Sequence, residues 1–348
     1  MRVFPNITVQ TELAHPHDLL TRYFLIDIEL FTCLLEHYGG TKVVRLFDLR
    51  SLQCESSTTI DDNLQEVIGD LRFSGKFKAG GYSKVFFFFE HQSTKVKRFC
   101  IRCLRKLLEF YEGCEADPKN TITDDGKYPY VFVIVLYHGK IPWKELLQMS
   151  DLVSLPPDAD DRHFLSFPAI LIDLSQVQYE TLTGHPALIA LLDTLQSASL
   201  GTLPKNFDRI VGYFEKIKTD PRIHGWLNSI TRYFLAVTKT DKEVVAGTIS
   251  KVLDKQEAEK MVTSTMEELF LQGEIKGRED GKIEGKIEGK IEGRIQDVLK
   301  ILNKRFKNVP NSVSQSVNSY TDLIALDSLF EYALDCETLE EFERELAH

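Results

Sequence analysis

Three oxygen-bearing side chains, those of Asp70, Glu90 and Gln92, fall at the ends of two neighbouring apolar runs. Two carboxylates and an amide oxygen are ligands that a hard divalent cation such as Mg2+ or Mn2+ prefers. Such an ion can activate water and neutralise charge that develops on a phosphate. The three residues therefore indicate metal-assisted hydrolysis, with an ordinary buried strand that ends in a carboxylate as the alternative.

A β-hairpin is predicted to position these residues. Residues 67–73 and 84–92 are rich in β-branched and aromatic side chains, and a Gly-Gly pair lies in the turn between them. Side chains alternate between the two faces of a strand, so pairing the strands can bring Asp70 and Glu90 together. We expect His91 to point to the opposite face.

The order of these residues resembles the core of PD-(D/E)XK nucleases, in which an Asp is followed by an acid at the end of a later apolar strand. The segment from Glu90 to Thr94, EHQST, is similar to the signature of one branch, the recombination-promoting nuclease/putative transposase (YhgA-like) family. Three further segments agree, and the resemblance covers most of residues 15–295. They are Pro16-His17-Asp18, the stretch VFVIVLYHGKIPW, and the glycine-periodic tail after Gln272.

The resemblance implies an α/β fold, a restriction-endonuclease-like mixed sheet flanked by helices and followed by a helical C-terminal extension. It also implies a metal-dependent DNA endonuclease with Asp70 and Glu90 as metal ligands. Gln92 takes the place of the usual catalytic Lys, and Gly69 replaces the usual Pro. The missing Lys leaves open which group positions the attacking water. The alternative is a catalytically inactive module that keeps the fold and binds nucleic acid or a partner.

Charge is distributed unevenly along the chain. The formal net charge of -10 argues against a general coat for nucleic acid. From Lys84 to Lys106, however, the sequence contains seven basic residues and one acidic residue, Glu90. This local excess would attract phosphates, and a solvated helix face is the alternative. The candidate DNA contacts are Lys95, Lys97, Arg98 and Arg102.

Two accessory candidates lie on other elements. Residues 18–38 have helical periodicity, and Asp18 either caps this helix or is among its carboxylates that could approach the metal. His138 follows the apolar run 130–137, which is predicted to be a central strand buried on both faces. At that edge His138 could orient a phosphate or water, or it could be a hydrogen-bonded structural residue.

The elements between these candidates can be read from their periodicity. Residues 98–111 are predicted to form an amphipathic helix between the strands 84–92 and 130–137, which gives a βαβ unit. Residues 43–47 are a short strand or connector, 51–62 a loop, 169–174 a strand, and 186–195 and 207–236 helical. In the predicted helix 98–111, five side chains are expected to face inward: Ile101, Leu104, Leu107, Leu108 and Tyr111.

Three parts are predicted along the chain. Residues 1–240 form the nuclease-like domain, 241–296 a charged helix with a GKIE repeat, and 297–348 a small helical module. Glycine recurs at every fourth position from Gly273 to Gly293. Six glycines weaken a helix by about 0.8–1.0 kcal/mol each relative to Ala, so a helix here needs a partner. The segment 273–293 is therefore expected to form a homo-oligomer or to be a flexible link.

No run of about 18 apolar residues and no secretory signal is present, so we expect a cytoplasmic protein without a membrane span. Cys100 and Cys103 form a Cys-x-x-Cys pair that could suggest zinc or redox chemistry. They fall in a helical stretch without a second pair, and we expect buried thiols instead.

Overall fold

The computed structural model describes residues 16–55, 71–78, 85–92, 99–116, 126–143 and 169–346, with the backbone alone for Lys42 and for residues 85–92. The chain divides into two compact units, Met1–Phe270 and Leu271–His348. Asp241–Phe270, which the sequence analysis assigned to the linking segment, falls within the first unit.

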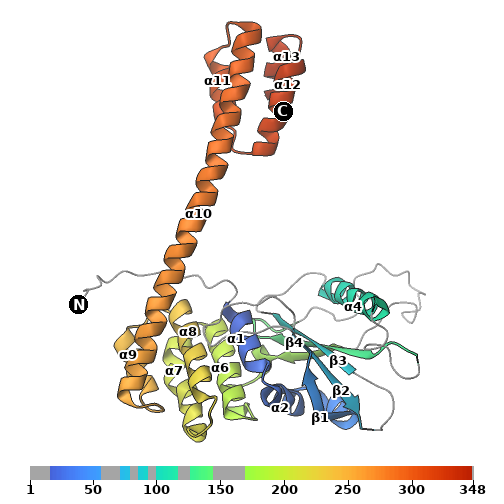
Figure 1. The fold of residues 1–348 in the computed structure, drawn as a ribbon, viewed down its shortest axis with the longest axis vertical. Helices are drawn as coiled ribbons and strands as arrows, with labels where there is room; N and C mark the ends of the chain where they lie inside the picture. The colour runs from blue at the N-terminus through green and yellow to red at the C-terminus, as the bar shows by residue number, and fades with distance from the viewer. Residues whose placement is uncertain are drawn as a thin grey trace. The chain divides into compact units, whose positions relative to one another are not determined.

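A five-stranded mixed sheet forms the centre of the first unit (Figure 1). The antiparallel pairs β1–β2 and β2–β3 are followed by the parallel pairs β3–β4 and β4–β5. This arrangement confirms the predicted hairpin and the predicted mixed sheet. In spatial order the strands are β1 Phe47–Cys54, β2 Arg72–Phe77, β3 Val85–Gln92, β4 Tyr130–Tyr137 and β5 Ala169–Asp173.

Helix α4, Phe99–Ala116, connects β3 to the parallel strand β4 and completes the predicted βαβ unit. Its buried row is Phe99, Cys103 and Leu107, spaced four residues apart. The prediction that Ile101 and Leu108 face inward is wrong, since they are 38% and 58% exposed. The α4 row packs against one face of the sheet, on Val131, Val133, Val135 and Tyr137, with Trp143 alongside.

The opposite face of the sheet packs against a larger helical layer. Phe132, Ile134 and Leu136 of β4 belong to this second core, so β4 is buried on both faces as its continuous apolar run predicts. Phe73 of β2 stacks on Phe31 with a centroid distance of 3.6 Å. The helices of this layer include α1 Pro16–Leu25, α2 Ile28–Tyr38, α3 Gly40–Leu46, α6 Pro186–Leu200, α7 Leu203–Gly212, α8 Ile223–Val237 and α9 Lys242–Ile249.

The structure corrects several predicted boundaries. The expected helix 18–38 is two helices, because the Asp27 side chain accepts a hydrogen bond from the Glu29 amide at 3.0 Å and caps α2. Residues 43–46 belong to α3, and β1 extends through Cys54 into the predicted loop. Strand β2 continues to Phe77 through residues assigned to the turn, whereas residues 67–70 lie outside the described part of the chain.

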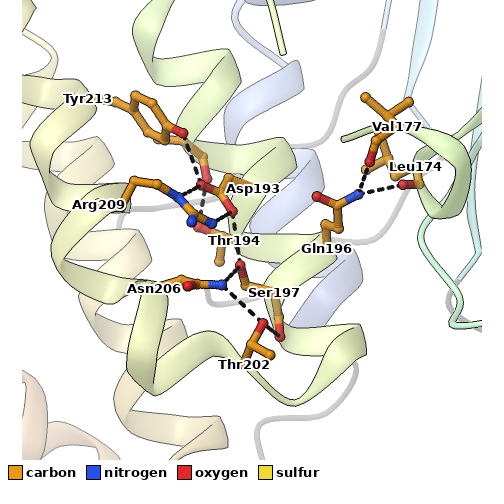
Figure 2. Close-up of polar contacts among 11 residues, drawn as sticks. Leu174, Val177, Asp193, Thr194, Gln196, Ser197, Thr202, Asn206, Arg209 and Tyr213 are labelled. Atoms are coloured by element: carbon orange, nitrogen blue, oxygen red, sulfur yellow. Dashed lines mark hydrogen bonds and ion pairs between the residues drawn. The ribbon is translucent and has the colours of Figure 1, made fainter. Parts of the chain in front are cut away.

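A buried carboxylate joins α6 to the helices that follow it (Figure 2). Both oxygens of Asp193 accept hydrogen bonds from Arg209, each at 2.8 Å, and the Tyr213 hydroxyl donates at 3.1 Å. Ser197 donates to the same carboxylate and accepts a hydrogen bond from Asn206. Asp193 is fully buried, so these contacts replace the water that its charge would otherwise need.

Helix α10, Lys255–Phe306, begins in the first unit and ends in the second. Its Ala258 and Val262 join the core of the first unit. Its Glu268 forms an ion pair with the buried Arg232 of α8. These contacts explain why the first unit extends to Phe270 rather than to residue 240.

The second unit has a hydrophobic core of its own. It contains the C-terminal part of α10 with α11 Asn311–Asn318, α12 Leu323–Asp335 and α13 Leu339–Leu346. Val298 and Leu302 of α10 pack in this core, whereas every residue from Glu274 to Lys290 is exposed. The glycine repeat is thus a solvent-exposed stretch of continuous helix.

Candidate functional site

The pairing of β3 with β4 determines the face of the sheet to which each β3 position belongs. Glu90 is opposite Val135 and Gln92 is opposite Tyr137. Val135 and Tyr137 belong to the core under α4, and paired strand positions share a face. The backbone positions of Glu90 and Gln92 therefore lie on the α4 face. His91 is opposite Leu136, whose side chain lies in the core on the other face.

Several predicted site residues lie outside the described part of the chain. These are Asp70, Lys95, Lys97 and Arg98, and for Glu90 and Gln92 only the backbone is described. Of the candidate DNA contacts, Arg102 is described. It is half-buried on α4, and its guanidinium carbon lies 5.2 Å from the centre of the Phe99 ring. Helix α4 therefore brings a basic side chain to the same face of the sheet as the positions of Glu90 and Gln92.

Asp173 is a carboxylate at this edge of the sheet that the sequence analysis did not single out. It ends β5 and lies opposite Tyr137, which lies opposite Gln92. Its Oδ2 accepts from the Trp143 amide at 2.9 Å, and its Oδ1 accepts from the Ser175 amide at 3.0 Å. These bonds fix the turn after β4 against the end of β5. An acid at the end of the apolar run AILID was the signal for it in the sequence.

Three carboxylates at the first two helices, those of Asp18, Asp27 and Glu29, have basic partners in the described structure. Asp18 lies inside the first turn of α1, because the helix begins at Pro16, and its carboxylate pairs with Arg22 at 2.8 Å. The expected capping role is therefore replaced by an ion pair within the helix. Asp27 and Glu29 both pair with Arg222, at 2.9 and 2.8 Å. Over the described ranges, no three His, Cys, Asp or Glu side chains gather in a way that could hold a metal ion.

His138 lies in the interior, directly after β4, and is 2% exposed. Its Nδ1 is 3.2 Å from the carbonyl oxygen of Leu195, and its ring centroid is 4.9 Å from that of His17. A hydrogen bond of 2.7 Å joins His17 Nδ1 to the Tyr233 hydroxyl. Of the two predicted roles, this geometry matches the hydrogen-bonded structural residue. The sequence gives no sign of the cluster, since His17 and Tyr233 are 216 positions apart.

The two histidines of this cluster are held in their neutral form. Burial and the neighbouring His17 lower the pKa of His138 from 6.5 to about 4, although the hydrogen bond with Leu195 acts in the opposite direction. Burial also lowers the pKa of His17. Burying a neutral ring requires less desolvation free energy than burying a charged one. The cluster can therefore connect the end of β4 to α1, α6 and α8 inside the protein.

The remaining sequence expectations concern cysteines and membranes. Cys100 and Cys103 are buried thiols on α4, as predicted. Within the described ranges, no helix has both the length and the apolar character needed to cross a lipid bilayer.

Comparison with known proteins supports the resemblance seen in the sequence. Residues 15–223 match the family described as "Putative transposase, YhgA-like". The chain is 29% identical over 183 residues to recombination-promoting nuclease RpnA of Escherichia coli K12, covering 52% of this chain and 59% of RpnA. It is 27% identical over 194 residues to recombination-promoting nuclease RpnD of Escherichia coli O157:H7, covering 55% of this chain and 69% of RpnD.

Some relatives carry a different description. The inactive recombination-promoting nuclease-like protein RpnE of Escherichia coli K12 is 24% identical over 189 residues, which cover 54% of this chain and 60% of RpnE. The chain thus spans a little over half to about two thirds of the length of these relatives. No solved structure is significantly similar to the chain. Since the family match covers more than half of its residues, the chain belongs to the YhgA-like putative transposase family.

Proposed function

We propose that the protein is a divalent-metal-dependent nuclease that hydrolyses phosphodiester bonds in DNA. The similarity to proteins named recombination-promoting nucleases supports this proposal. The observation that carries it is the pairing of β2 with β3, in which Arg72 lies opposite Phe88. Asp70 precedes Arg72 by two positions and Glu90 follows Phe88 by two. If the antiparallel pairing continues, as we propose, the two carboxylates are direct neighbours on the α4 face.

The residues of this proposed site suit a hard divalent ion. Glu90 and Gln92 are two positions apart on one strand and share a face, so their side-chain oxygens can converge with that of Asp70. Mg2+ or Mn2+ is the proposed cofactor, and when bound it supplies Lewis-acid activation of water and neutralisation of phosphate charge. Asp70 and Glu90 would hold the ion, and the Gln92 amide would orient the attacking water in place of the usual Lys. This site, on a mixed sheet between helices, is the proposed PD-(D/E)XK core.

The proposed DNA contacts come from the segment that joins β3 to α4 and from α4 itself. Lys95, Lys97 and Arg98 come three to six positions after Gln92 in the sequence, and Arg102 lies on α4 over the same face of the sheet. Basic side chains beside the carboxylates would draw the DNA backbone to the metal, and their attraction would weaken as the salt concentration rises.

The second candidate is an inactive module that keeps the fold and binds nucleic acid or a partner. The similarity to RpnE, which is described as inactive, supports this second candidate. This module would bind DNA without cleaving it, because it would lack either the metal or a productive geometry for water.

A plasmid-cleavage assay separates the two functions. Full-length protein is incubated with supercoiled plasmid in Mg2+, in Mn2+ and in EDTA, beside the variants Asp70→Asn and Glu90→Gln. We expect metal-dependent nicking or cutting that falls by at least about a hundredfold in either variant, since each substitution removes a charged ligand that would hold the metal ion, and the ion would stabilise the transition state. Glu109→Gln, which changes an exposed acid on α4, is the matched control and should keep full activity.

Circular dichroism spectra of all variants establish that they fold. Cleavage that persists at the wild-type rate in both Asp70→Asn and Glu90→Gln would contradict the proposal. Binding of the plasmid without cleavage in either metal would support the inactive module instead.

A further inference from the structure

The loop that follows β4 carries an exposed tip made of one basic and one apolar residue. We call residues 139–143 the edge loop. Lys140 and Ile141 at its tip are exposed, whereas Gly139 and Trp143 at its two ends are buried. Ile141 is 62% exposed, more than any other large apolar side chain that the structure describes in the first unit. Packing within this unit therefore does not account for an isoleucine at the tip.

The two ends of the edge loop are fixed to the sheet and to α4. The Tyr137 hydroxyl donates a hydrogen bond of 2.7 Å to the carbonyl oxygen of Ile141. The Trp143 amide donates to Asp173 Oδ2 at 2.9 Å. The Trp143 ring makes edge contacts with Tyr137 and Phe99, at centroid distances of 5.0 and 5.3 Å. These contacts hold the backbone on both sides of the tip in one conformation.

The glycine at the start of the edge loop makes room for the first of these anchors. A Cβ atom added at Gly139 would lie 2.0 Å from the Tyr137 hydroxyl oxygen and 2.3 Å from the ring carbon that bears it. A larger residue would displace the tyrosine and break its hydrogen bond to the Ile141 carbonyl. The sequence of the loop is therefore matched to a fixed tip.

The edge loop lies beside the proposed cleavage site. Strands β3, β4 and β5 are parallel, and their last residues Gln92, Tyr137 and Asp173 lie opposite one another at a single edge of the sheet. Ligands of open α/β sheets bind outside the carboxyl ends of the strands. A loop that leaves β4 at this edge can therefore contact a substrate that reaches Gln92.

We propose that the edge loop is a DNA wedge, in which Ile141 inserts between adjacent base pairs from the minor groove and Lys140 binds a backbone phosphate beside it. This inference rests on the proposed function, because it takes DNA as the substrate. Proteins that kink DNA use isoleucine and other apolar side chains to unstack a base step. A tip that is already fixed loses little conformational entropy on binding, so more of the contact free energy remains to offset unstacking.

A wedge predicts which DNA the protein binds best. Unstacking requires less free energy at flexible pyrimidine–purine steps and at mismatched pairs than in uniformly paired DNA. The substrate class is therefore duplex DNA in which stacking is locally weak, and the preference follows deformability rather than the pattern of base edges.

Binding of full-length protein to two duplexes in EDTA tests the role of Ile141 without cleavage. One duplex is fully paired, and the other has a central mismatch beside the fluorescent base 2-aminopurine. We expect wild type to bind the mismatched duplex at least about tenfold more tightly and to raise the 2-aminopurine fluorescence as the base unstacks. Ile141→Ser should lose most of this preference and the fluorescence change, whereas Ile141→Met should keep both. Ile324→Ser is the matched control, because Ile324 is 78% exposed on α12.

A second substitution tests the role of Lys140. Lys140→Gln should weaken binding to both duplexes alike and lower the slope of log K against log salt by about 1, while the preference for the mismatch remains. Lys239→Gln, which removes another exposed lysine, is the charge-matched control and should leave the slope unchanged.

The outcomes separate this inference from the proposed nuclease activity. Wild-type preference and fluorescence change in Ile141→Ser would overturn the wedge even if plasmid cleavage is observed. A mismatch preference that depends on Ile141, without plasmid cleavage in either metal, would support the wedge and overturn the nuclease alone. Failure of wild type to bind either duplex would overturn the wedge. So would sedimentation velocity in which Ile141→Ser dissociates a wild-type oligomer while DNA binding is unchanged, because the tip would then be a protein contact.

Discussion

The rings of His17 and His138 lie with their centroids 4.9 Å apart, tilted by 60°, between α1 and the end of β4. Tyr233 hydrogen bonds to the first ring and the Leu195 carbonyl to the second. A proton added to either ring would place a charge in the interior beside the other ring. The two histidines therefore make the first unit sensitive to acid.

We expect the free energy of unfolding to fall as the pH drops from 6.5 to about 4. The folded pKa of His138 is lowered to about 4, so in this window the unfolded chain takes up a proton that the folded chain does not. The loss should approach about 3 kcal/mol and level off below pH 4. Urea unfolding at several pH values, compared with His138→Gln, measures it. The same pH dependence in both proteins would contradict this expectation.

Removing the arginine of the Asp193–Arg209 pair should destabilise the first unit strongly. In Arg209→Leu the fully buried carboxylate of Asp193 loses its cation and two hydrogen bonds, with an expected loss of about 3–5 kcal/mol. Arg209→Lys keeps the charge but not the two-point contact and should lose less. Lys251→Ala breaks an exposed ion pair with Asp208 and should cost less than about 1 kcal/mol. Urea denaturation compares all three, and equal losses at positions 209 and 251 would show that burial of the pair is unimportant.

The proposed DNA contacts predict a change in salt dependence. Replacing Lys95 and Lys97 with Gln should weaken binding to duplex DNA of any sequence and lower the slope of log K against log salt by about 2. Fluorescence anisotropy in EDTA, over a series of salt concentrations, measures the slope without cleavage. The double substitution of the exposed Lys205 and Lys239 is the charge-matched control. If both double variants behave alike, net charge rather than the proposed contact governs binding.

Glycine in the repeat should be replaceable with a gain in local stability. Gly285→Ala adds a Cβ into open space and should stabilise the helix by about 0.8–1.0 kcal/mol. Amide hydrogen exchange of residues 274–290 should then slow by about fivefold. Gly184→Ala is the contrasting case, because Gly184 has a φ of 114° and its Cβ would lie 2.7 Å from Cys33 Sγ. That variant should be less stable than wild type. Unchanged exchange of residues 274–290 in Gly285→Ala would contradict the helix argument.

The sheet and its connections were predictable because their signals are local. The continuous apolar run of β4 indicated a strand buried on both faces, and the helix between two apolar runs indicated the parallel pair β3–β4. The inward face of α4 was predicted in part, because Leu107 lies in the buried row and Tyr111 packs against that core, whereas Ile101 and Leu108 are exposed. Cys103 acts there as a small apolar residue in the buried row with Phe99 and Leu107.

The polar interior could not be predicted, because its partners come together only in the fold. Nothing local distinguishes Asp193 from an exposed helix acid, and its partner Arg209 is on the next helix. Asp27 similarly reads as one more residue of a helical pattern, yet its side chain caps α2 and splits the predicted helix. For the candidate metal site, the sequence supplied the residue types and the structure supplies the strand register at Glu90 and Gln92.

The exposed repeat has a consequence for how the chain can vary in length. Residues 274–290 contribute to neither hydrophobic core, and the same four-residue pattern recurs through the last three repeats. Inserting or deleting one GKIE unit keeps the rows of Lys, Ile and Glu continuous and breaks no packed contact. Length polymorphism in this stretch would therefore carry little thermodynamic penalty in either unit.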